Sequence, residues 1–359
     1  MKVKFEVYPH LLQFKIEAGT SRGTFTQKET WIIRAVSDAK HSTFGIGEAS
    51  PLKGLSVDYS EDYGLKLIAL LDSLEVLNIP DNQDELFDFV SNNTPNDKPS
   101  MRFGLETALL DLINGGTKTL FESSFTKGLT SIPINGLVWM GSYDAMNAQI
   151  DEKLKSGYNC IKIKMGAIDF EQELELIERL RARYTSEEIS IRVDANGAFS
   201  GDNALGKLDE LAAFGIHSIE QPIMPGQTDV MRRLCEASLL PIALDEELIG
   251  VHSKEAMLSL LREIRPAYII LKPSLLGGFL ACNDWIATAE SLNIGWWMTS
   301  MLESNVGLNA IAQFASTCPN LMHQGLGTGQ LYSNNIVSPL VIRNGGLKYN
   351  VRGKWGIVG

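Results

Sequence analysis

Five ionisable residues recur at a nearly constant interval through the chain: Lys164, Asp194, Glu220, Asp245 and Lys272. Each ends a short apolar segment, and neighbours in this set are about 25 to 30 residues apart, the length of one strand–helix repeat. In a parallel barrel, such a repeat carries the last residue of every strand to the same end, where these folds place their chemistry. We therefore expect all five side chains to meet at one mouth of a barrel.

The three acids in this set indicate a metal site. Carboxylates that converge in one mouth repel each other unless a cation balances them, and hard oxygen ligands suit Mg²⁺. Asp194, Glu220 and Asp245 are the predicted ligands, with Mn²⁺ as a substitute metal; zinc is disfavoured because the set has no His or Cys. Taken singly, each acid could be a solvated or ion-paired loop residue. Glu246 and Glu247 come next, but strand alternation points Glu246 away from the mouth.

The lysines are predicted to transfer the proton. Lys164 and Lys272 fall on the second and sixth strands of the expected barrel, so they would flank whatever the metal binds. Near a divalent cation the pKa of a lysine falls, and its neutral amine can remove a proton. Lys162 is on the same side of the strand as Lys164, where a second ammonium would lower the pKa of Lys164 further. The alternative is that Lys162 is a surface lysine. This set suits proton abstraction next to a carboxylate.

Two neighbours of Asp194 are candidates for supporting roles. Asn196 follows it by two residues and is expected to hold a carboxylate or a water, although Asn196-Gly197 is also a typical turn dipeptide. Arg192 precedes it by two residues and should point the same way. It could support a carboxylate deeper in the barrel or form a structural ion pair.

Two successive patterns of apolar and polar residues along the chain predict the elements that position these residues. In the first, apolar and polar residues alternate before helical periodicity sets in, which predicts an α+β unit over residues 1–120. In the second, short apolar strands alternate with amphipathic helices, which predicts a parallel sheet. We expect an α/β protein with a TIM-like (β/α)7β barrel over residues 121–334. The α+β unit would cap it, with the tail 335–359 folding back onto this capping domain.

The expected barrel strands are bounded by turn residues and by the charged residues described above. They comprise residues 132–139, 160–164, 189–194, 216–220, 242–245, 268–272 and 294–298, with an eighth strand near 323–326. Seven or eight such strands favour a closed barrel over an open sheet.

Composition and charge exclude several classes of protein. The 359 residues are 44% hydrophobic and 21% charged, as in ordinary globular chains. A net charge of −11 without a basic stripe argues against nucleic-acid binding, and the apolar run near Ile269 is too short to span a membrane. The four cysteines are far apart, which indicates reduced thiols in a cytoplasmic protein. The expected partner is a small-molecule carboxylate, and the chain could form a homo-oligomer.

The motifs around the charged residues resemble those of a known family. The chain is similar to the enolase superfamily, and more narrowly to its muconate-lactonising subgroup, in the segments Lys162-Ile163-Lys164, Val193-Asp194-Ala195-Asn196, Ile219-Glu220-Gln221-Pro222, Leu244-Asp245-Glu246 and Leu271-Lys272-Pro273. Segments 47–52 and 102–111 resemble the capping domain of this subgroup. The resemblance covers nearly the whole chain and implies a magnesium enzyme with a base lysine in the Lys-x-Lys motif.

Within the subgroup, segments 299–307 and 325–329 resemble most closely the branch that dehydrates 2-succinyl-6-hydroxy-2,4-cyclohexadiene-1-carboxylate to 2-succinylbenzoate in menaquinone biosynthesis. This implies a lyase in which Lys164 takes the proton next to the ring carboxylate and then assists departure of the hydroxyl, while Lys272 stabilises the enediolate. Ser300, Glu303 and Gly327 lie in these segments and are candidate substrate or supporting residues. Glu303 could face the pocket or pair with a lysine. The glycines around Gly327 could bring backbone N–H groups to a substrate carboxylate or simply form a tight loop.

Three alternative functions stay open. One is racemisation of an N-succinylamino acid, with Lys164 and Lys272 as bases on opposite faces. Another is dipeptide epimerisation, although epimerases of the subgroup carry an Asp-x-Asp pair on the eighth strand where this chain has Gly327-Thr328-Gly329. The third is a non-catalytic barrel that binds a carboxylate, which would not need the paired lysines.

Overall fold

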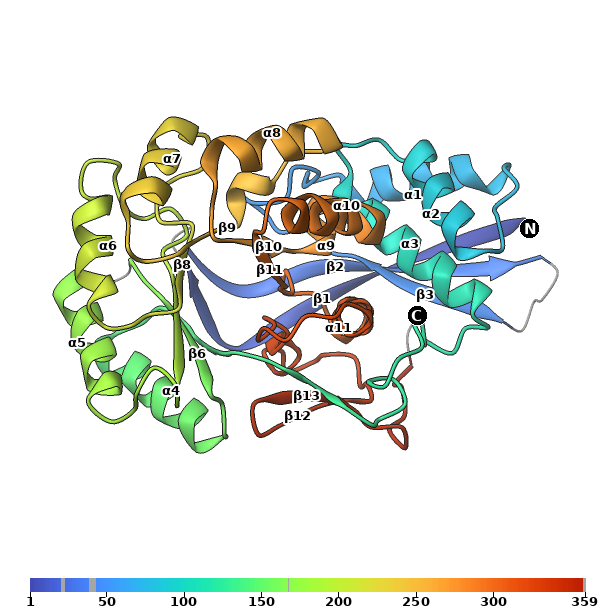
Figure 1. Ribbon diagram of the computed structural model, residues 1–359. Coiled ribbons are helices and arrows are strands. Elements are labelled where there is room, and N and C mark those ends of the chain that lie inside the picture. The colour runs from blue at the N-terminus through green and yellow to red at the C-terminus, as the bar shows by residue number, and fades with distance from the viewer. Residues whose placement is uncertain (21–22, 39–42, 167, 358–359) are drawn as a thin grey trace.

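An antiparallel sheet with three helices forms the first part of the computed structural model, which describes residues 1–20, 23–38, 43–166 and 168–357 (Figure 1). Two long strands pair antiparallel in a hairpin, with Val3 opposite Ser37, and a third strand pairs antiparallel with the second. We call these elements the N-terminal unit: β1 (Val3–Thr20), β2 (Gly23–Ser37), β3 (Phe44–Ala49), α1 (Tyr63–Glu75), α2 (Gln83–Asn93) and α3 (Pro99–Ile113).

Helix α3 packs very closely on β3 because both elements carry glycine at the contact. A Cβ atom at Gly47 would lie 2.0 Å from the carbonyl oxygen of Gly104, and one at Gly104 would lie 2.8 Å from the Ala49 nitrogen. The Ile46 N–H also donates to the Asp111 carboxylate at 2.9 Å. Larger residues at either glycine would push α3 off the sheet.

A seven-stranded parallel sheet forms the second part of the protein, in the order β11-β10-β9-β8-β7-β6-β5. Its strands are β5 (Gly136–Val138), β6 (Cys160–Lys164), β7 (Ser190–Asp194), β8 (Ser218–Glu220), β9 (Ile242–Leu244), β10 (Tyr268–Leu271) and β11 (Gly295–Met298). Strand order follows chain order throughout, as expected for repeated right-handed crossovers. The α/β class and the parallel sheet are therefore confirmed.

Helices connect these strands, and Figure 1 shows α4 to α8 along the outside of the sheet. They are α4 (Tyr143–Lys155), α5 (Phe170–Arg181), α6 (Ala204–Ala212), α7 (Thr228–Ala237), α8 (Lys254–Ile264), α9 (Pro273–Leu276), α10 (Gly278–Ser291) and α11 (Asn305–Thr317). Within the described residues, none of the helices is both long enough and apolar enough to cross a membrane.

The two ends of the expected barrel differ from the prediction. The strand predicted over 132–139 is divided into β4 (Ser131–Pro133) and β5, which belong to different sheets. The eighth strand is represented by isolated parallel bridges, between Ile134 and Gln324 and between Thr299 and Gly325. On one side of this segment, the Gln324 N–H donates to Pro133 of β4 and the Gln324 carbonyl accepts the Asn135 N–H just before β5. On the other side, the Gly325 N–H donates to Met298 of β11.

The tail forms a hairpin that pairs with β4. Strands β12 (Leu340–Arg343) and β13 (Gly346–Tyr349) make a three-stranded sheet in the order β12-β13-β4. Further along, Trp355 packs against Ile32 and Ile46 of the N-terminal unit. The tail thus contacts the N-terminal unit through a side chain while its strands pair elsewhere; residues 358–359 lie outside the described part.

Two buried glutamates attach the N-terminal unit to helices that follow the parallel strands. Glu48 of β3 accepts the Ser304 and Gly307 N–H groups at the start of α11, both at 2.8 Å. Glu106 of α3 accepts the Phe279 N–H in the first turn of α10. Carboxylates at helix N-termini satisfy unpaired N–H groups and interact favourably with the helix dipole. These contacts hold the N-terminal unit against the C-terminal ends of β10 and β11.

Replacing Glu106 with glutamine is expected to flatten the pH dependence of stability. Burial raises the pKa of Glu106 from 4.5 to about 8, against the opposing effects of the Phe279 N–H and Arg102. Its contribution to stability is therefore complete below about pH 4.5 and is lost as the pH rises through about 8. We expect this loss to reach at most roughly 5 kcal/mol in the free energy of unfolding. Chemical denaturation of Glu106→Gln across this window should show a smaller decline than wild type, whereas the exposed control Asp72→Asn should behave as wild type.

Candidate active site

The parallel strands bring the five predicted residues to one end of the sheet. Strands β6, β7 and β8 end at Lys164, Asp194 and Glu220, and their registers place Lys164 beside Asp194 and Asp194 beside Glu220. Asp245 and Lys272 come directly after β9 and β10. All five residues are buried.

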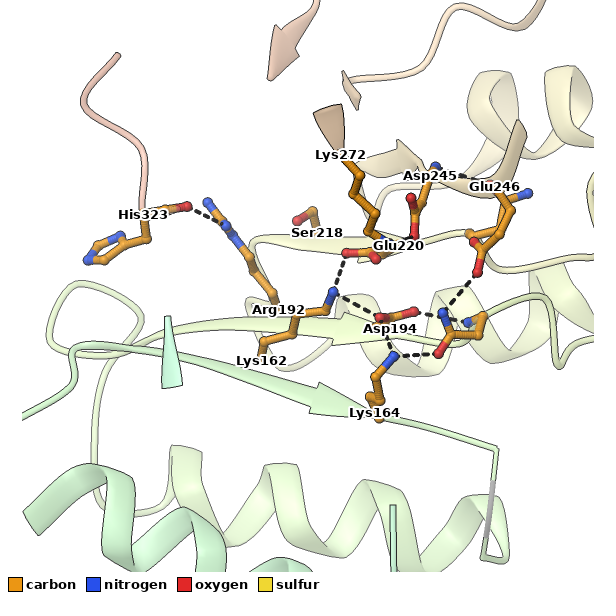
Figure 2. A network of polar contacts seen from close by, with 12 residues as sticks. Lys162, Lys164, Arg192, Asp194, Ser218, Glu220, Asp245, Glu246, Lys272 and His323 are labelled. Atoms are coloured by element: carbon orange, nitrogen blue, oxygen red, sulfur yellow. Dashed lines mark hydrogen bonds and ion pairs between the residues drawn. The ribbon is translucent and has the colours of Figure 1, made fainter. Parts of the chain in front are cut away.

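Figure 2 shows the acids of this site between the lysines. Lys162 Nζ lies 2.8 Å from Asp194 Oδ2 and 2.6 Å from Glu220 Oε2. Lys164 Nζ approaches the same Asp194 oxygen at 3.0 Å. Lys272 Nζ donates to Asp245 Oδ2. Lys164 and Lys272 therefore reach the acids from opposite sides, as their positions on distant strands predict.

The pKa shifts reflect this dense packing of charge. Burial alone would raise the pKa of Asp194, but the Lys162 and Lys164 ammonium groups outweigh it and hold this pKa well below its usual range. Burial raises the pKa of Glu220 to about 8, and the neighbouring Asp194 carboxylate adds to the shift. The Lys272 pKa is raised, because Asp245 and other carboxylates outweigh the effect of burial.

Lys162 pairs with two of the acids. Burial would lower its pKa, but the attraction of Asp194 and Glu220 is stronger and raises it. Its ammonium group therefore bridges two carboxylates. The contact between Lys162 and Glu220 could not be predicted from the sequence, because the distance from Lys162 to Glu220 on β8 depends on the curvature of the sheet.

The carboxylates fit a divalent cation in their chemistry. Glu220 Oε1 is buried and has no hydrogen-bond partner in the structure, so one carboxylate oxygen is left for a further ligand. The donor set is all oxygen, from three successive strands, as Mg²⁺ prefers. In the described ranges, no three Asp, Glu, His or Cys side chains are already grouped as metal ligands. Instead, the lysine ammonium groups pair with the acids.

Asn196 and Glu246 extend the site beyond the strand ends. Asn196 Oδ1 accepts from Lys164 Nζ at 2.6 Å, and Asn196 Nδ2 donates to Glu246 Oε1 at 3.1 Å. The prediction that Glu246 points away was wrong. Strand alternation stops at Leu244, and a 3₁₀ turn over Glu246–Leu248 redirects the side chain. Asn196 is also in the left-handed region, with φ of 45°, consistent with its being a turn residue.

Arg192 lies beside the acids and contacts aromatic and backbone groups (Figure 2). Its Nη1 donates to the His323 carbonyl at 2.7 Å, and its guanidinium lies 3.8 Å from the centre of the Trp297 ring (Figure 2). Among the described residues Arg192 forms no ion pair; burial lowers the pKa of Arg192, while nearby charges that include the Glu220 carboxylate act in the opposite direction.

Ser300 and Glu303 lie in the turn after β11 and bind each other. Ser300 Oγ donates to Glu303 Oε2, and the Lys28 ammonium attracts the Glu303 carboxylate. Gly327 lies just before a 3₁₀ turn (Thr328–Gln330) and packs near Asn135. In the same glycine segment, the Gly325 N–H is used by the Met298 carbonyl and is not left for a ligand.

Two residues next to the site were given no role by the sequence argument. Gln221 adopts φ of 40°, and its Oε1 accepts the Asp245 N–H at 3.2 Å, which orients the start of that turn. Trp139 follows β5, and the centre of its ring lies 5.9 Å from Lys164 Nζ. The Glu220-Gln221-Pro222 motif was a signal for Gln221, whereas nothing local distinguished Trp139.

Comparison with known proteins identifies the family. The family model for the enolase C-terminal domain-like family matches residues 145–356. An o-succinylbenzoate synthase from Desulfotalea psychrophila is 46% identical over 355 residues, covering 93% of this chain and 95% of that protein. The chain therefore belongs to the enolase C-terminal domain-like family, and the predicted membership of the enolase superfamily is confirmed.

Solved structures agree with this assignment. The crystal structure of MenC from Desulfotalea psychrophila superposes with a TM-score of 0.86 at 41% identity, covering 97% of this chain and all (100%) of that one. A muconate lactonizing enzyme from Pseudomonas fluorescens has the same fold, with a TM-score of 0.83 at 23% identity over 99% of this chain and 96% of that one.

Proposed function

We propose that this enzyme is an o-succinylbenzoate synthase, a lyase that removes water from 2-succinyl-6-hydroxy-2,4-cyclohexadiene-1-carboxylate to form 2-succinylbenzoate in menaquinone biosynthesis. The observation that carries the proposal is the position of Lys164 and Lys272 on two sides of three buried acids. The 46% identity to an o-succinylbenzoate synthase over 93% of the chain supports the choice of substrate. The direct test is formation of the aromatic product from the cyclohexadiene substrate.

Lys164 is the proposed base and then the acid. Asp194 Oδ2 and Asn196 Oδ1 both accept from its ammonium, at 3.0 and 2.6 Å, which fixes the direction of the amine. Once deprotonated, the amine takes the proton next to the ring carboxylate, and the resulting ammonium returns a proton to the departing hydroxyl on the same face. Lys272, on the other side, stays charged and stabilises the developing negative charge.

Asp194, Glu220 and Asp245 are the residues that would hold Mg²⁺, or Mn²⁺ in its place. When bound, the metal would neutralise charge on the substrate carboxylate and so make the neighbouring C–H bond more acidic. The three acids are balanced in formal charge by Lys162, Lys164 and Lys272.

The fold proposal is a closed (β/α)7β barrel capped by the N-terminal unit. The segment 324–325 supports closure, because Gln324 bonds Asn135 just before β5 and Gly325 bonds Met298 of β11. Contacts of Leu52 with Leu275 and Met301 support a cap over the strand ends. The domain limits 1–120, 121–334 and 335–359, a cytoplasmic location and a homo-oligomer stay predictions.

Racemisation of an N-succinylamino acid is the second candidate, because lysines on opposite sides suit proton exchange on both faces of a carbon. Dehydration is favoured by the degree of identity to the synthase, whereas the L-Ala-D/L-Glu epimerase from Bacillus subtilis is 24% identical over 66% of the chain. Parallel assays for dehydration and for loss of stereochemistry at the α-carbon of an N-succinylamino acid distinguish the two reactions.

Replacing Glu220 with glutamine is expected to weaken magnesium binding and dehydration together. The change keeps the shape of the side chain and removes a charged ligand. Because residues that merely support metal ligands cost about 10- to 100-fold when mutated, we expect a loss of roughly 100-fold or more. Calorimetric titration with Mg²⁺ and turnover in excess chelator measure the effect, with the exposed Glu178→Gln as control. Full wild-type activity in chelator would refute the metal site.

A further inference from the structure

A second buried polar cluster lies beside the catalytic lysines, where the N-terminal unit meets the turns after β10 and β11. We call Lys28, Ser274, Ser300 and Glu303 the Glu303 cluster. Glu303 and Ser274 are fully buried at 0% exposure, and Lys28 and Ser300 are each 4% exposed. Among the described residues, no hydrogen bond or ion pair joins this cluster to the three acids of the catalytic site.

Glu303 joins two turns that belong to different strands. Its Oε1 accepts from Ser274 Oγ, in the turn after β10. Its Oε2 accepts from Ser300 Oγ and from the Met301 N–H at 2.7 Å, in the turn after β11. Buried carboxylate hydrogen bonds of this kind are among the stronger ones in proteins. The two turns are therefore fixed to each other through one side chain.

Ser274 lies in the short helix α9, which begins directly after Lys272. Lys272 caps the N-terminus of the short helix α9, and its carbonyl accepts the Leu275 and Leu276 N–H groups at 2.8 and 3.1 Å. A movement of Ser274 would therefore be transmitted over two residues to the Lys272 backbone. Misplacement of a catalytic group by about 1 Å can lower a rate by roughly 100-fold.

Lys28 brings the balancing positive charge from the N-terminal unit. It lies on β2, and its Nζ donates to the Ser50 carbonyl at 3.3 Å and to Ser50 Oγ. Burial lowers the pKa of Lys28, while the Glu303 and Glu48 carboxylates act in the opposite direction. Among the described residues no ion pair joins Lys28 to Glu303, so the two charges attract each other at longer range while Ser50 holds the Lys28 ammonium.

We propose that Glu303 is a positioning residue that sets Lys272 through Ser274, and that Lys28 of the N-terminal unit supplies its counter-charge. The inference rests on the proposed function for the role of Lys272. It makes the placement of one catalytic lysine dependent on the contact between the N-terminal unit and the parallel strands.

The first test compares Ser274→Ala and Glu303→Gln with the wild type. We expect kcat for dehydration to fall by roughly 10- to 100-fold in each. Hydrogen exchange at the Leu275 and Leu276 amides should become faster, since both bond to the Lys272 carbonyl. Ser73→Ala, an exposed helical serine that bonds the Leu70 carbonyl, is the matched control and should change neither.

The second test uses the double variant Ser274→Ala with Glu303→Gln, together with two substitutions of Lys28. If Glu303 acts through Ser274, the double variant should lose no more kcat than the more damaged single variant. Lys28→Arg keeps the charge and should retain more activity than Lys28→Met. The proposal would be overturned if the fold-losses of kcat in the two single variants multiplied in the double variant. It would also be overturned if Glu303→Gln lowered Tm but left kcat and amide hydrogen exchange unchanged. If the wild type does not dehydrate the substrate, the proposed function fails, while the exchange measurement still decides the coupling.

Discussion

Replacing Lys164 with alanine is expected to abolish dehydration. The amine of Lys164 is the group that takes the proton and returns one to the hydroxyl, and alanine has no titratable atom. Positioned acid–base groups contribute about 10²- to 10⁴-fold, and here one side chain serves both steps. We therefore expect kcat to fall by at least the upper part of this range, measured by formation of 2-succinylbenzoate.

The controls separate lost chemistry from lost structure. Lys155→Ala removes an exposed lysine from α4 and should leave kcat at the wild-type value. Lys164→Ala should still bind Mg²⁺, because the three acids stay in place. Near-normal dehydration by Lys164→Ala would contradict the mechanism, since Lys272 approaches from the opposite side and pairs with Asp245.

Replacing Lys272 with arginine is expected to separate dehydration from racemisation. Arginine keeps a positive charge, but it stays protonated at any working pH and cannot act as a base. Dehydration needs only the charge of Lys272, so part of it should survive. Racemisation needs proton exchange on both faces, so it should fall to the background of the assay.

The measurement is a pair of assays on the same variant: product formation from the cyclohexadiene substrate, and deuterium exchange with loss of stereochemistry for an N-succinylamino acid. Lys272→Met removes the charge and is expected to lower dehydration more than arginine does. Racemisation that persists in Lys272→Arg would contradict the two-base assignment. Equal dehydration by the arginine and methionine variants would contradict the role of the charge.

The chemistry of the strand ends could be predicted from the sequence because a period of about 25 to 30 residues is set by the length of a strand–helix repeat. Residues separated by that period must fall at equivalent places in a parallel sheet. Lys164, Asp194 and Glu220 are therefore neighbours in register, as the repeat alone requires. Their side chains also had to be paired, since ionised groups are rarely buried alone.

The details that failed depend on what happens beyond the strands. Glu246 turned toward Asn196 because β9 ends at Leu244, and alternation has no meaning in the 3₁₀ turn that follows. Likewise, the segment 132–139 reads as one apolar strand, but β13 pairs with its first part and β6 with its second. Because the pairing partners β13 and β6 are distant in the chain, the sequence pattern shows neither the break between β4 and β5 nor the sheet to which each belongs.

The charged set, its common end of the sheet and the alternation of strands and helices could be predicted because they follow from residue type and spacing. Which charges pair depends on the tertiary structure. Lys162 bridges Asp194 and Glu220, and Glu303 fixes Ser274, because the curvature of the sheet and the docking of the N-terminal unit bring atoms of distant segments within hydrogen-bond distance. Electrostatic and hydrogen-bond energies depend on those distances and on burial, and neither can be read from spacing along the chain.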